Sequence, residues 1–254
     1  MPSRNRIKKA ETDISKKTWT NCVVAITGAN GSLGKALTKR FRANGAYVIG
    51  LTHNKVLKIK ELDTDAPNEW IHWECGKEYM LEKTLTKLDI LILNHGINPQ
   101  GDQSIESINS ALEINALSSW RLIMIYEKIA QGEDASRDTK QLWINTSEAE
   151  IQPTLSPGYE VSKRLLGELT SLRKNNINKK GYLKIKKIIL GPFKSELNPI
   201  GIMSADFVAN QIIFQSNLNF DLIIVSPNPF TYLLMPIIEI IRSIYSKLTK
   251  QNRL

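Results

Sequence analysis

The sequence has few of the residues that hold small or metal-dependent domains together. Cys22 and Cys75 are its only cysteines among 254 residues, and they lack both the paired spacing of a zinc site and the number needed for a disulfide framework. The three histidines, His53, His72 and His95, are too dispersed for a histidine-rich iron centre. We therefore expect no metal, and the cysteine content fits a reducing, cytoplasmic compartment best.

Long apolar runs are also missing. The N-terminus is polar and basic with no apolar segment behind it, which argues against a secretory signal peptide. The longest uncharged stretch, residues 222–238, contains three prolines and is shorter than the roughly 20 residues that span a bilayer. We expect no transmembrane helix.

The net charge of +9 is concentrated at the two chain ends. Residues 1–19 hold six basic and two acidic residues, and residues 240–254 hold four basic residues and no acid. The body between them is almost neutral, so we expect no nucleic-acid interface. The ends are interpreted as solvated tails, or as segments weakly attracted to an anionic membrane surface.

Short apolar strands alternate with amphipathic helices along the chain. Strands are predicted at residues 22–27, 47–51, 70–74, 89–93, 141–146, 184–190 and 222–225, and the clearest helices at 32–44, 104–130 and 157–175. Because such strands need crossovers, this order predicts a doubly wound α/β fold with a mostly seven-stranded parallel sheet. We expect one domain over residues 20–228, after a basic polar tail at 1–19. Residues 132–140 are predicted to be a solvent-exposed loop.

The C-terminal segment, residues 229–254, has the pattern of an amphipathic helix. Its apolar residues recur at three- and four-residue spacing, with charges on other faces: Leu234, Ile237, Ile238, Ile241, Ile244, Tyr245 and Leu248. One interpretation is a helix docked on the sheet or on a partner subunit. The alternative is a helix lying in a membrane interface, with the protein cytoplasmic but membrane-associated.

A glycine-rich turn follows the first predicted strand. Thr27-Gly28-Ala29-Asn30-Gly31-Ser32-Leu33-Gly34 lies between that strand and a helix, where glycines permit a tight turn, close approach of a pyrophosphate and close helix packing. The helix N-terminus supplies free N–H groups for phosphates. We predict a dinucleotide site that includes Gly28, Asn30, Gly31, Leu33 and Gly34.

The end of the second strand indicates which dinucleotide is bound. Where an acid would hold the ribose hydroxyls of NAD, this chain has Thr52, His53 and Lys55, which favour the 2′-phosphate of NADP unless they are merely exposed turn residues. Asn94 and Gly96, after another strand, are predicted to let the chain pass close to the adenine ribose. His95 between them is interpreted as a packing or hydrogen-bonding residue rather than a catalytic one.

Tyr159 and Lys163 share one face of a predicted helix, because they are four residues apart. An ammonium beside a phenol favours the phenolate and lowers the pKa of the tyrosine from its usual value near 10. Tyr159 is therefore a candidate general acid for reducing a ketone and general base for oxidising an alcohol.

Five ordered segments together resemble the short-chain dehydrogenase/reductase family over residues 20–226. They are the glycine turn, Asn94-His95-Gly96 in place of the family's Asn-Asn-Ala-Gly, Asn115, Ser147, and Tyr159 with Lys163. The resemblance implies a Rossmann fold and a catalytic tetrad. In it Tyr159 exchanges the proton, Lys163 lowers its pKa and binds the nicotinamide ribose, Ser147 polarises the carbonyl, and Asn115 holds a water that links Lys163 to solvent. Ser195 stands where the family touches the cofactor carboxamide.

The chain departs from the family pattern in places. The TGxxGxxG spacing is commoner in extended members, but the short region after Lys163 favours the classical architecture. Ser147 lies one residue closer to Tyr159 than usual, which leaves Thr146 as an alternative hydroxyl. The chain also resembles the dehydrogenase portion of bifunctional sterol desaturase/short-chain dehydrogenases.

The leading hypothesis is an NADP(H)-dependent oxidoreductase acting on an apolar ketone, aldehyde or secondary alcohol, because the segment after Ser195 is apolar. The alternatives are a non-catalytic NADP(H)-binding sensor or scaffold, and an epimerase or dehydratase that uses the cofactor transiently, against which the short C-terminal region argues. The resemblance also implies a homodimer or homotetramer formed through residues 104–130 and 157–175.

Overall fold

The computed structural model describes residues 19–54, 65–132 and 139–251, apart from the side chains of residues 175, 176, 179 and 246–250. Its strands are β1 (Val23–Thr27), β2 (Tyr47–Thr52), β3 (Glu69–His72), β4 (Ile90–Leu93), β5 (Lys140–Ser147), β6 (Leu183–Leu190) and β7 (Leu222–Val225). They form one sheet of order β3-β2-β1-β4-β5-β6-β7, parallel throughout. The doubly wound, seven-stranded prediction is confirmed.

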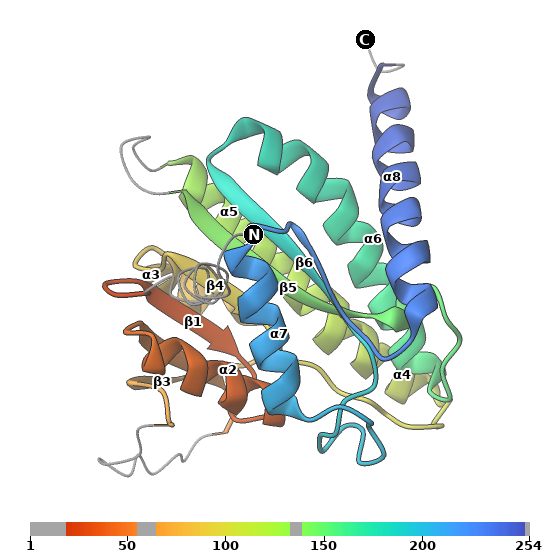
Figure 1. Ribbon diagram of the computed structural model, residues 1–254, viewed down its shortest axis with the longest axis horizontal. Coiled ribbons are helices and arrows are strands. Elements are labelled where there is room, and N and C mark those ends of the chain that lie inside the picture. The colour runs from red at the N-terminus through yellow and green to blue at the C-terminus, as the bar shows by residue number, and fades with distance from the viewer. Residues whose placement is uncertain (1–18, 55–64, 133–138, 252–254) are drawn as a thin grey trace, which may run out of the picture.

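Helices cover both faces of this sheet (Figure 1). The long ones are α2 (Ser32–Ala43), α4 (Ile105–Leu112), α5 (Ser118–Gln131), α6 (Pro157–Lys180), α7 (Ala205–Asn217) and α8 (Pro229–Gln251). Short turns are η1 (Glu78–Leu81), α3 (Glu82–Leu85), η2 (Glu113–Leu117) and η3 (Glu148–Glu150). Helices α2 and α7 pack on one face, while α5 and α6 pack on the other.

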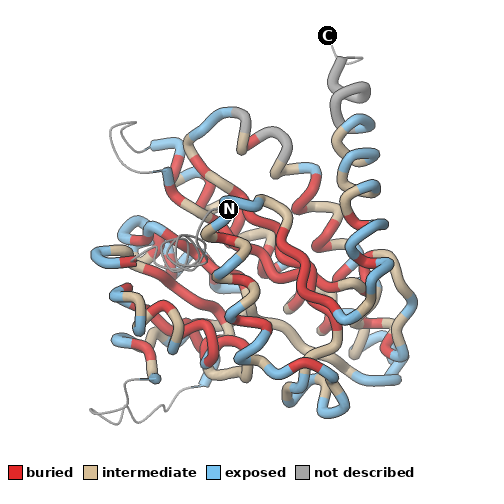
Figure 2. The backbone as a smooth tube through the Cα atoms, viewed as in Figure 1, coloured by how far each residue is buried: buried red, intermediate tan, exposed pale blue. Residues whose placement is uncertain are grey.

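The core follows from the alternation of side chains along the strands. In β1, Val24 and Ile26 point into the cluster under α2 and α7, whereas Ala25 points into the cluster under α5 and α6. Figure 2 shows the resulting buried strands between more exposed helices. Because both faces are covered, the strands consist of nearly continuous apolar residues rather than alternating ones.

Three sequence boundaries differ from the structure. Trp19, assigned to the tail, is buried in the core, where its ring lies edge-on to Phe41 and Trp143. Lys140, assigned to an exposed loop, is buried at the start of β5 and donates a hydrogen bond to the carbonyl of Thr86 at 3.3 Å. The helix predicted over residues 104–130 is interrupted by the π-helical turn η2.

In the described part of the chain, we find no helix both long and apolar enough to cross a membrane.

Candidate active site

The glycine turn has the geometry of a phosphate cradle. Gly28 has φ of +62°, a left-handed conformation that glycine adopts without strain. A Cβ on Gly34 would lie 2.3 Å from the carbonyl oxygen of Gly28, so only glycine lets α2 approach this turn. Gly31 is the N-cap of α2 with no side-chain cap, and the first turn carries no acid. The N–H groups of α2 are thus suited to a pyrophosphate, and the turn fits a dinucleotide.

The other predicted residues of this turn differ in what they expose. Asn30 is partly exposed, whereas the side chain of Leu33 is buried in the core beneath α2. Leu33 therefore offers a dinucleotide its backbone N–H at the helix start rather than its side chain.

The predicted 2′-phosphate residues lie at the end of β2. Thr52 is buried, and its hydroxyl accepts a hydrogen bond from the N–H of Asn54 at 3.2 Å. His53 is exposed, and its carbonyl oxygen lies 3.0 Å from Nε2 of His72. Lys55 lies outside the described residues. The preference for a 2′-phosphate stays a prediction.

The Asn94-His95-Gly96 turn is tied to the glycine turn through Thr27. The Thr27 hydroxyl accepts from the N–H of Asn94 at 2.8 Å and lies 2.8 Å from Nδ1 of His95. Asn94 donates to the carbonyl of Gly28 at 3.3 Å and accepts from the side chain of Asn145 at 2.8 Å. The two loops at the carboxyl edge of β1 and β4 therefore form one rigid unit.

His95 is a packing residue, as the sequence indicated. Its ring lies edge-on to Trp73, with centroids 5.1 Å apart. Burial, followed by the nearby positive charge of Lys163, lowers the pKa of His95 to about 4, so the imidazole is neutral at physiological pH.

Asn115 lies in the π-helical turn η2 and braces the loop that contains Gly96. Its Oδ1 accepts from the N–H of Ile97 at 2.7 Å, while its Nδ2 donates to the carbonyl of Ile97 at 3.0 Å and to the hydroxyl of Ser162 at 2.9 Å. A Cβ on Gly96 would lie 2.9 Å from Asn115 Oδ1 and 3.9 Å from Lys163 Nζ. A side chain at Gly96 would therefore crowd the amide of Asn115.

Ser147, Tyr159 and Lys163 come together at the wall of one cavity. Ser147 ends β5, and both Ser147 and Tyr159 line the cavity, with the Ser147 side chain near enough to lower the pKa of the tyrosine. Lys163, one turn further along α6, has its Nζ 5.7 Å from the centre of the Tyr159 ring and donates to the carbonyl of Asn145 at 3.3 Å. Thr146 instead donates to the carbonyl of Ile188 at 3.1 Å, so Ser147 is the hydroxyl beside the tyrosine.

The pKa of Tyr159 differs from the prediction. Burial raises this pKa above its usual value, the Ser147 hydrogen bond lowers it, and the Glu148 carboxylate raises it. The predicted net lowering is therefore wrong for the protein alone. Burial also lowers the pKa of Lys163 to about 8, against a smaller opposing effect of Glu150, so the ammonium is mostly charged at pH 7.

The cavity has a volume of about 700 Å³. Six predicted site residues line it: Asn94, Gly96, Ser147, Tyr159, Lys163 and Ser195. Leu155, Phe193, Leu197 and Ile200 give part of its wall an apolar character. Ser195 is held in a tight turn, because its N–H donates to the carbonyl of Asn198 at 3.1 Å.

Sequence reasoning missed three residues of this site. Asn145 lines the cavity with a buried Oδ1 that has no hydrogen-bond partner in the structure. Glu148 and Glu150 follow Ser147 directly and act on the pKa values of Tyr159 and Lys163. Their position immediately after the predicted serine was the available signal.

Together, the parallel sheet, the glycine turn at its carboxyl edge and the adjoining cavity define a dinucleotide-binding protein of the Rossmann type. Residues 24–149 match the model of the NAD dependent epimerase/dehydratase family. The chain is 36% identical, over 87% of its length, to the Monoglucosyldiacylglycerol epimerase of Synechocystis sp.. It belongs to the short-chain dehydrogenase/reductase family.

Solved structures agree on the fold. A short chain dehydrogenase from Burkholderia cenocepacia in complex with NADP has a TM-score of 0.69 at 14% identity, over 81% of this chain and 88% of the other. BdcA in complex with NADPH has a TM-score of 0.66 at 17% identity, over 82% and 93%. The chain spans only 53% of the Synechocystis protein. The resemblance to bifunctional sterol desaturase/short-chain dehydrogenases stays a prediction.

Proposed function

We propose that the cavity binds NADP(H) beside a carbonyl or secondary alcohol, and that Tyr159 exchanges the hydroxyl proton as hydride is transferred. One observation carries this proposal: Tyr159, Ser147 and Lys163 line the wall of the same cavity, with the Lys163 Nζ 5.7 Å from the centre of the Tyr159 ring. An acid, a second hydroxyl and a positive charge therefore converge where a carbonyl oxygen can sit.

The chain offers a contact for each part of the dinucleotide. The N-terminus of α2 would hold the pyrophosphate, Asn94 and Gly96 the adenine ribose, Lys163 the nicotinamide ribose, and Ser195 the carboxamide. Thr52, His53 and Lys55 would hold the 2′-phosphate. When bound, the nicotinamide supplies or accepts hydride. Support comes from the NADP and NADPH in the two solved structures with this fold.

In the reducing direction Tyr159 donates its proton to the oxygen that was the carbonyl, and in the oxidising direction its phenolate removes the proton of the alcohol. Ser147 stabilises the negative charge that develops on that oxygen, and Lys163 stabilises the phenolate. The apolar part of the wall favours a substrate with an apolar portion.

The test is loss of NADPH absorbance with a panel of ketones and aldehydes. Turnover should occur in the wild type and should fall by a factor of about 100 or more in Tyr159→Phe. The control is Tyr182→Phe, which should keep wild-type turnover, because the Tyr182 hydroxyl does not line the cavity and instead donates to Glu127 at 2.9 Å. Turnover in Tyr159→Phe equal to that of the wild type would show that Tyr159 is not the general acid. NADPH binding without turnover of any compound would favour the sensor or scaffold.

The preference for NADP over NAD needs its own measurement. Titration of intrinsic fluorescence should show tighter binding of NADPH than of NADH. His53→Asp, which adds a carboxylate at the exposed end of β2, should weaken NADPH binding and spare NADH. The same change in both affinities would contradict the assignment of this turn to the 2′-phosphate.

A second candidate function is epimerisation at a carbinol carbon of a sugar headgroup. The identity to Monoglucosyldiacylglycerol epimerase over most of the chain favours it, and this outweighs the argument from the short C-terminal region. An epimerase would use Tyr159 twice, first to remove the hydroxyl proton and then to return it once hydride has been re-added to the opposite face of the ketone.

The two candidates differ in cofactor balance. With monoglucosyldiacylglycerol and oxidised cofactor in mixed micelles, the nicotinamide would accept the carbinol hydride and return it to the opposite face. An epimerase would thus change the configuration of the sugar, measured by chromatography after release of the headgroup, without net formation of NADPH. A dehydrogenase or reductase would change the cofactor in proportion to product. Tyr159→Phe should abolish either reaction.

A further inference from the structure

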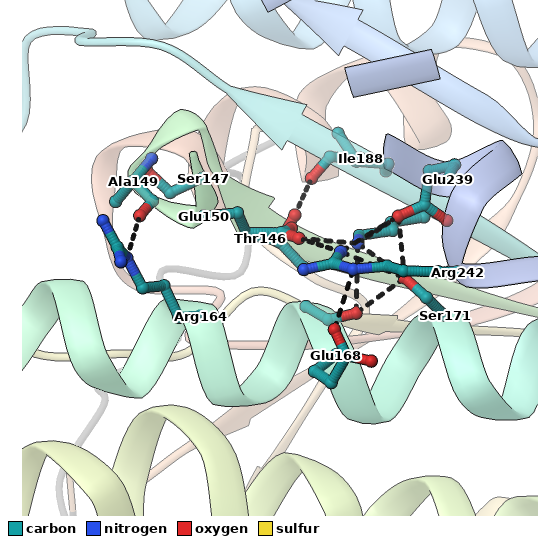
Figure 3. Close-up of polar contacts among 12 residues, drawn as sticks. Thr146, Ser147, Ala149, Glu150, Arg164, Glu168, Ser171, Ile188, Glu239 and Arg242 are labelled. Carbon is teal, nitrogen blue, oxygen red and sulfur yellow. Dashed lines mark hydrogen bonds and ion pairs between the residues drawn. The ribbon is translucent and has the colours of Figure 1, made fainter. Parts of the chain in front are cut away.

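Helix α8 docks on the protein through its charged side chains. Lys187 of β6 donates to Oε2 of Glu150 at 2.7 Å and to Oε1 of Glu239 at 2.8 Å. Arg242, one turn after Glu239, donates to the same Oε2 of Glu150 at 2.9 Å. Figure 3 shows Glu150, Glu239 and Arg242 converging above α6, with Glu168 and Ser171 beside them. Charges of both signs thus attach α8 to the interior.

The apolar side chains of α8 point the other way. Apart from Tyr232, which is also exposed, its exposed large apolar residues recur at three- and four-residue spacing: Phe230, Leu233, Leu234, Ile237, Ile240, Ile241, Ile244 and Tyr245. We call these eight residues the outer face of α8. The inward side carries Thr231, Met235, Glu239 and Arg242. The helix does dock on the sheet, where Met235 packs against Ile189 and Ile224, but the outer face is not covered within the described chain.

This orientation is the reverse of that in an ordinary surface helix, which buries its apolar face and exposes its charges. An apolar strip of this length exposed on a folded domain is typical of a surface that binds another apolar phase. The cluster around Lys187 opposes rotation of α8, because rotation would remove Glu239 and Arg242 from the buried pair of Glu150 and Lys187.

The outer face begins beside the cavity. Gln152, which lines the cavity, donates to the hydroxyl of Thr231 in the first turn of α8 at 3.1 Å and accepts from Asn228 at 3.0 Å. Leu155 and Ile200 also line the cavity, and they are 93% and 87% exposed. The cavity is thus lined partly by exposed apolar side chains, and through Gln152 it adjoins the first turn of α8.

We propose that the outer face of α8, with Leu155 and Ile200, binds the surface of a lipid bilayer that contains anionic lipids. The outer face provides the apolar area that enters the interface. Glu239 is the only acid in α8 and is paired inside, whereas Lys247, Lys250 and Arg253 follow in the sequence with no acid, a charge pattern that complements anionic headgroups. A second copy of the chain would cover α8 but would not explain the exposed apolar residues that line the cavity.

The surface also indicates how a substrate reaches the site. A lipid with a polar headgroup would present that headgroup to Tyr159 while its tails remain in the bilayer. The presentation of a headgroup to Tyr159 rests on the proposed function. Binding to the bilayer does not, because it requires no turnover.

Co-sedimentation with vesicles of phosphatidylcholine and phosphatidylglycerol tests the proposal. The double variant Ile240→Gln with Ile244→Gln makes two exposed side chains of the outer face polar. Its matched control is Tyr79→Gln with Met80→Gln, two exposed apolar residues in η1, far from α8 in Figure 1. Because the four side chains are exposed, all proteins should keep the thermal unfolding midpoint of the wild type.

The wild type and the control should sediment with the vesicles, and the partition coefficient of the α8 variant should be at least about tenfold lower. The proposal is overturned if the wild type stays in the supernatant or if both variants bind equally. It is also overturned if the α8 variant changes only the oligomeric state in analytical ultracentrifugation. NADPH turnover is measured on the same samples, so a wild type that turns over substrate but does not bind vesicles refutes the lipid surface and leaves the proposed function standing.

Discussion

Lys187 and Glu150 form an ion pair of 2.7 Å in which neither side chain is exposed to solvent. Such a pair loses the hydration of both charges, and it persists here because Glu239, Arg242 and Ser171 supply further hydrogen bonds. The pair joins the strand beside β5 to the short turn that follows Ser147. It therefore connects the docking of α8 to the segment that carries Ser147.

Removing the buried ammonium should destabilise the protein strongly. Lys187→Met leaves the Glu150 carboxylate buried next to one cation instead of two, which should lower the free energy of unfolding by about 3–5 kcal/mol. The matched control is Lys184→Met on the same strand, whose ammonium pairs with Asp221 at 3.3 Å near the surface and should cost less than about 1 kcal/mol. Urea unfolding measures both values. An equal decrease in the free energy of unfolding in both variants would show that the buried ion pair stabilises the protein no more than the surface pair does.

Helix α6 has a glycine where the Glu150 carboxylate crosses it. A Cβ on Gly167 would lie 2.0 Å from Oε2 of Glu150, so Gly167→Ala should displace the carboxylate and cost about 1–3 kcal/mol despite the better helix propensity of alanine. At Gly132 the nearest atom would be 3.6 Å away, and Gly132→Ala serves as the control. If Gly167→Ala were as stable as the wild type or more stable, a Cβ at this position would not crowd the Glu150 carboxylate.

His95 should make the protein sensitive to acid. Its pKa is about 4 in the folded chain and 6.5 when solvated, so the unfolded state binds more protons between these values. The free energy of unfolding should then decrease as the pH falls from 6.5 to 4, by up to about 3 kcal/mol. His95→Asn should lose this part of the slope. The measurement is urea unfolding at a series of pH values, and the same slope in both proteins would contradict a buried neutral imidazole.

Glu148 should set the pH range of alcohol oxidation, where the phenolate of Tyr159 is required. The carboxylate raises the pKa of Tyr159, so Glu148→Gln should shift the pH dependence of kcat/KM for oxidation to lower pH. Glu160→Gln is the control, because Glu160 is next to Tyr159 in the sequence but pairs with Arg164 at 2.8 Å. An unshifted profile in Glu148→Gln, or the same shift in both variants, would contradict a direct effect of Glu148.

The sequence predicts the strands and the glycine turn well because both depend on local patterns. Residues 23–27 are apolar and β-branched, and a glycine turn follows them, so a buried strand and a phosphate cradle were expected. The break in the helix at Asn115 was not expected, because the three- and four-residue spacing continues through η2. A single extra residue in one helical turn leaves almost no trace in the hydrophobic pattern.

The orientation of α8 could not be predicted for a different reason. A hydrophobic pattern shows that a helix has two faces, but the face that is buried depends on partners distant in the sequence. Glu239 and Arg242 face inward because they meet Lys187 and Glu150, which lie 52 and 92 residues earlier in the chain. Local sequence carries no sign of that match.

The ion cluster around Lys187 also decides where the folding unit ends. A division of the chain after β7, with α8 as an appendage, would separate Glu239 and Arg242 from the charges that they neutralise. The smallest part of this protein able to fold must therefore extend through Arg242, and α8 is as much a part of the domain as the strands of its sheet.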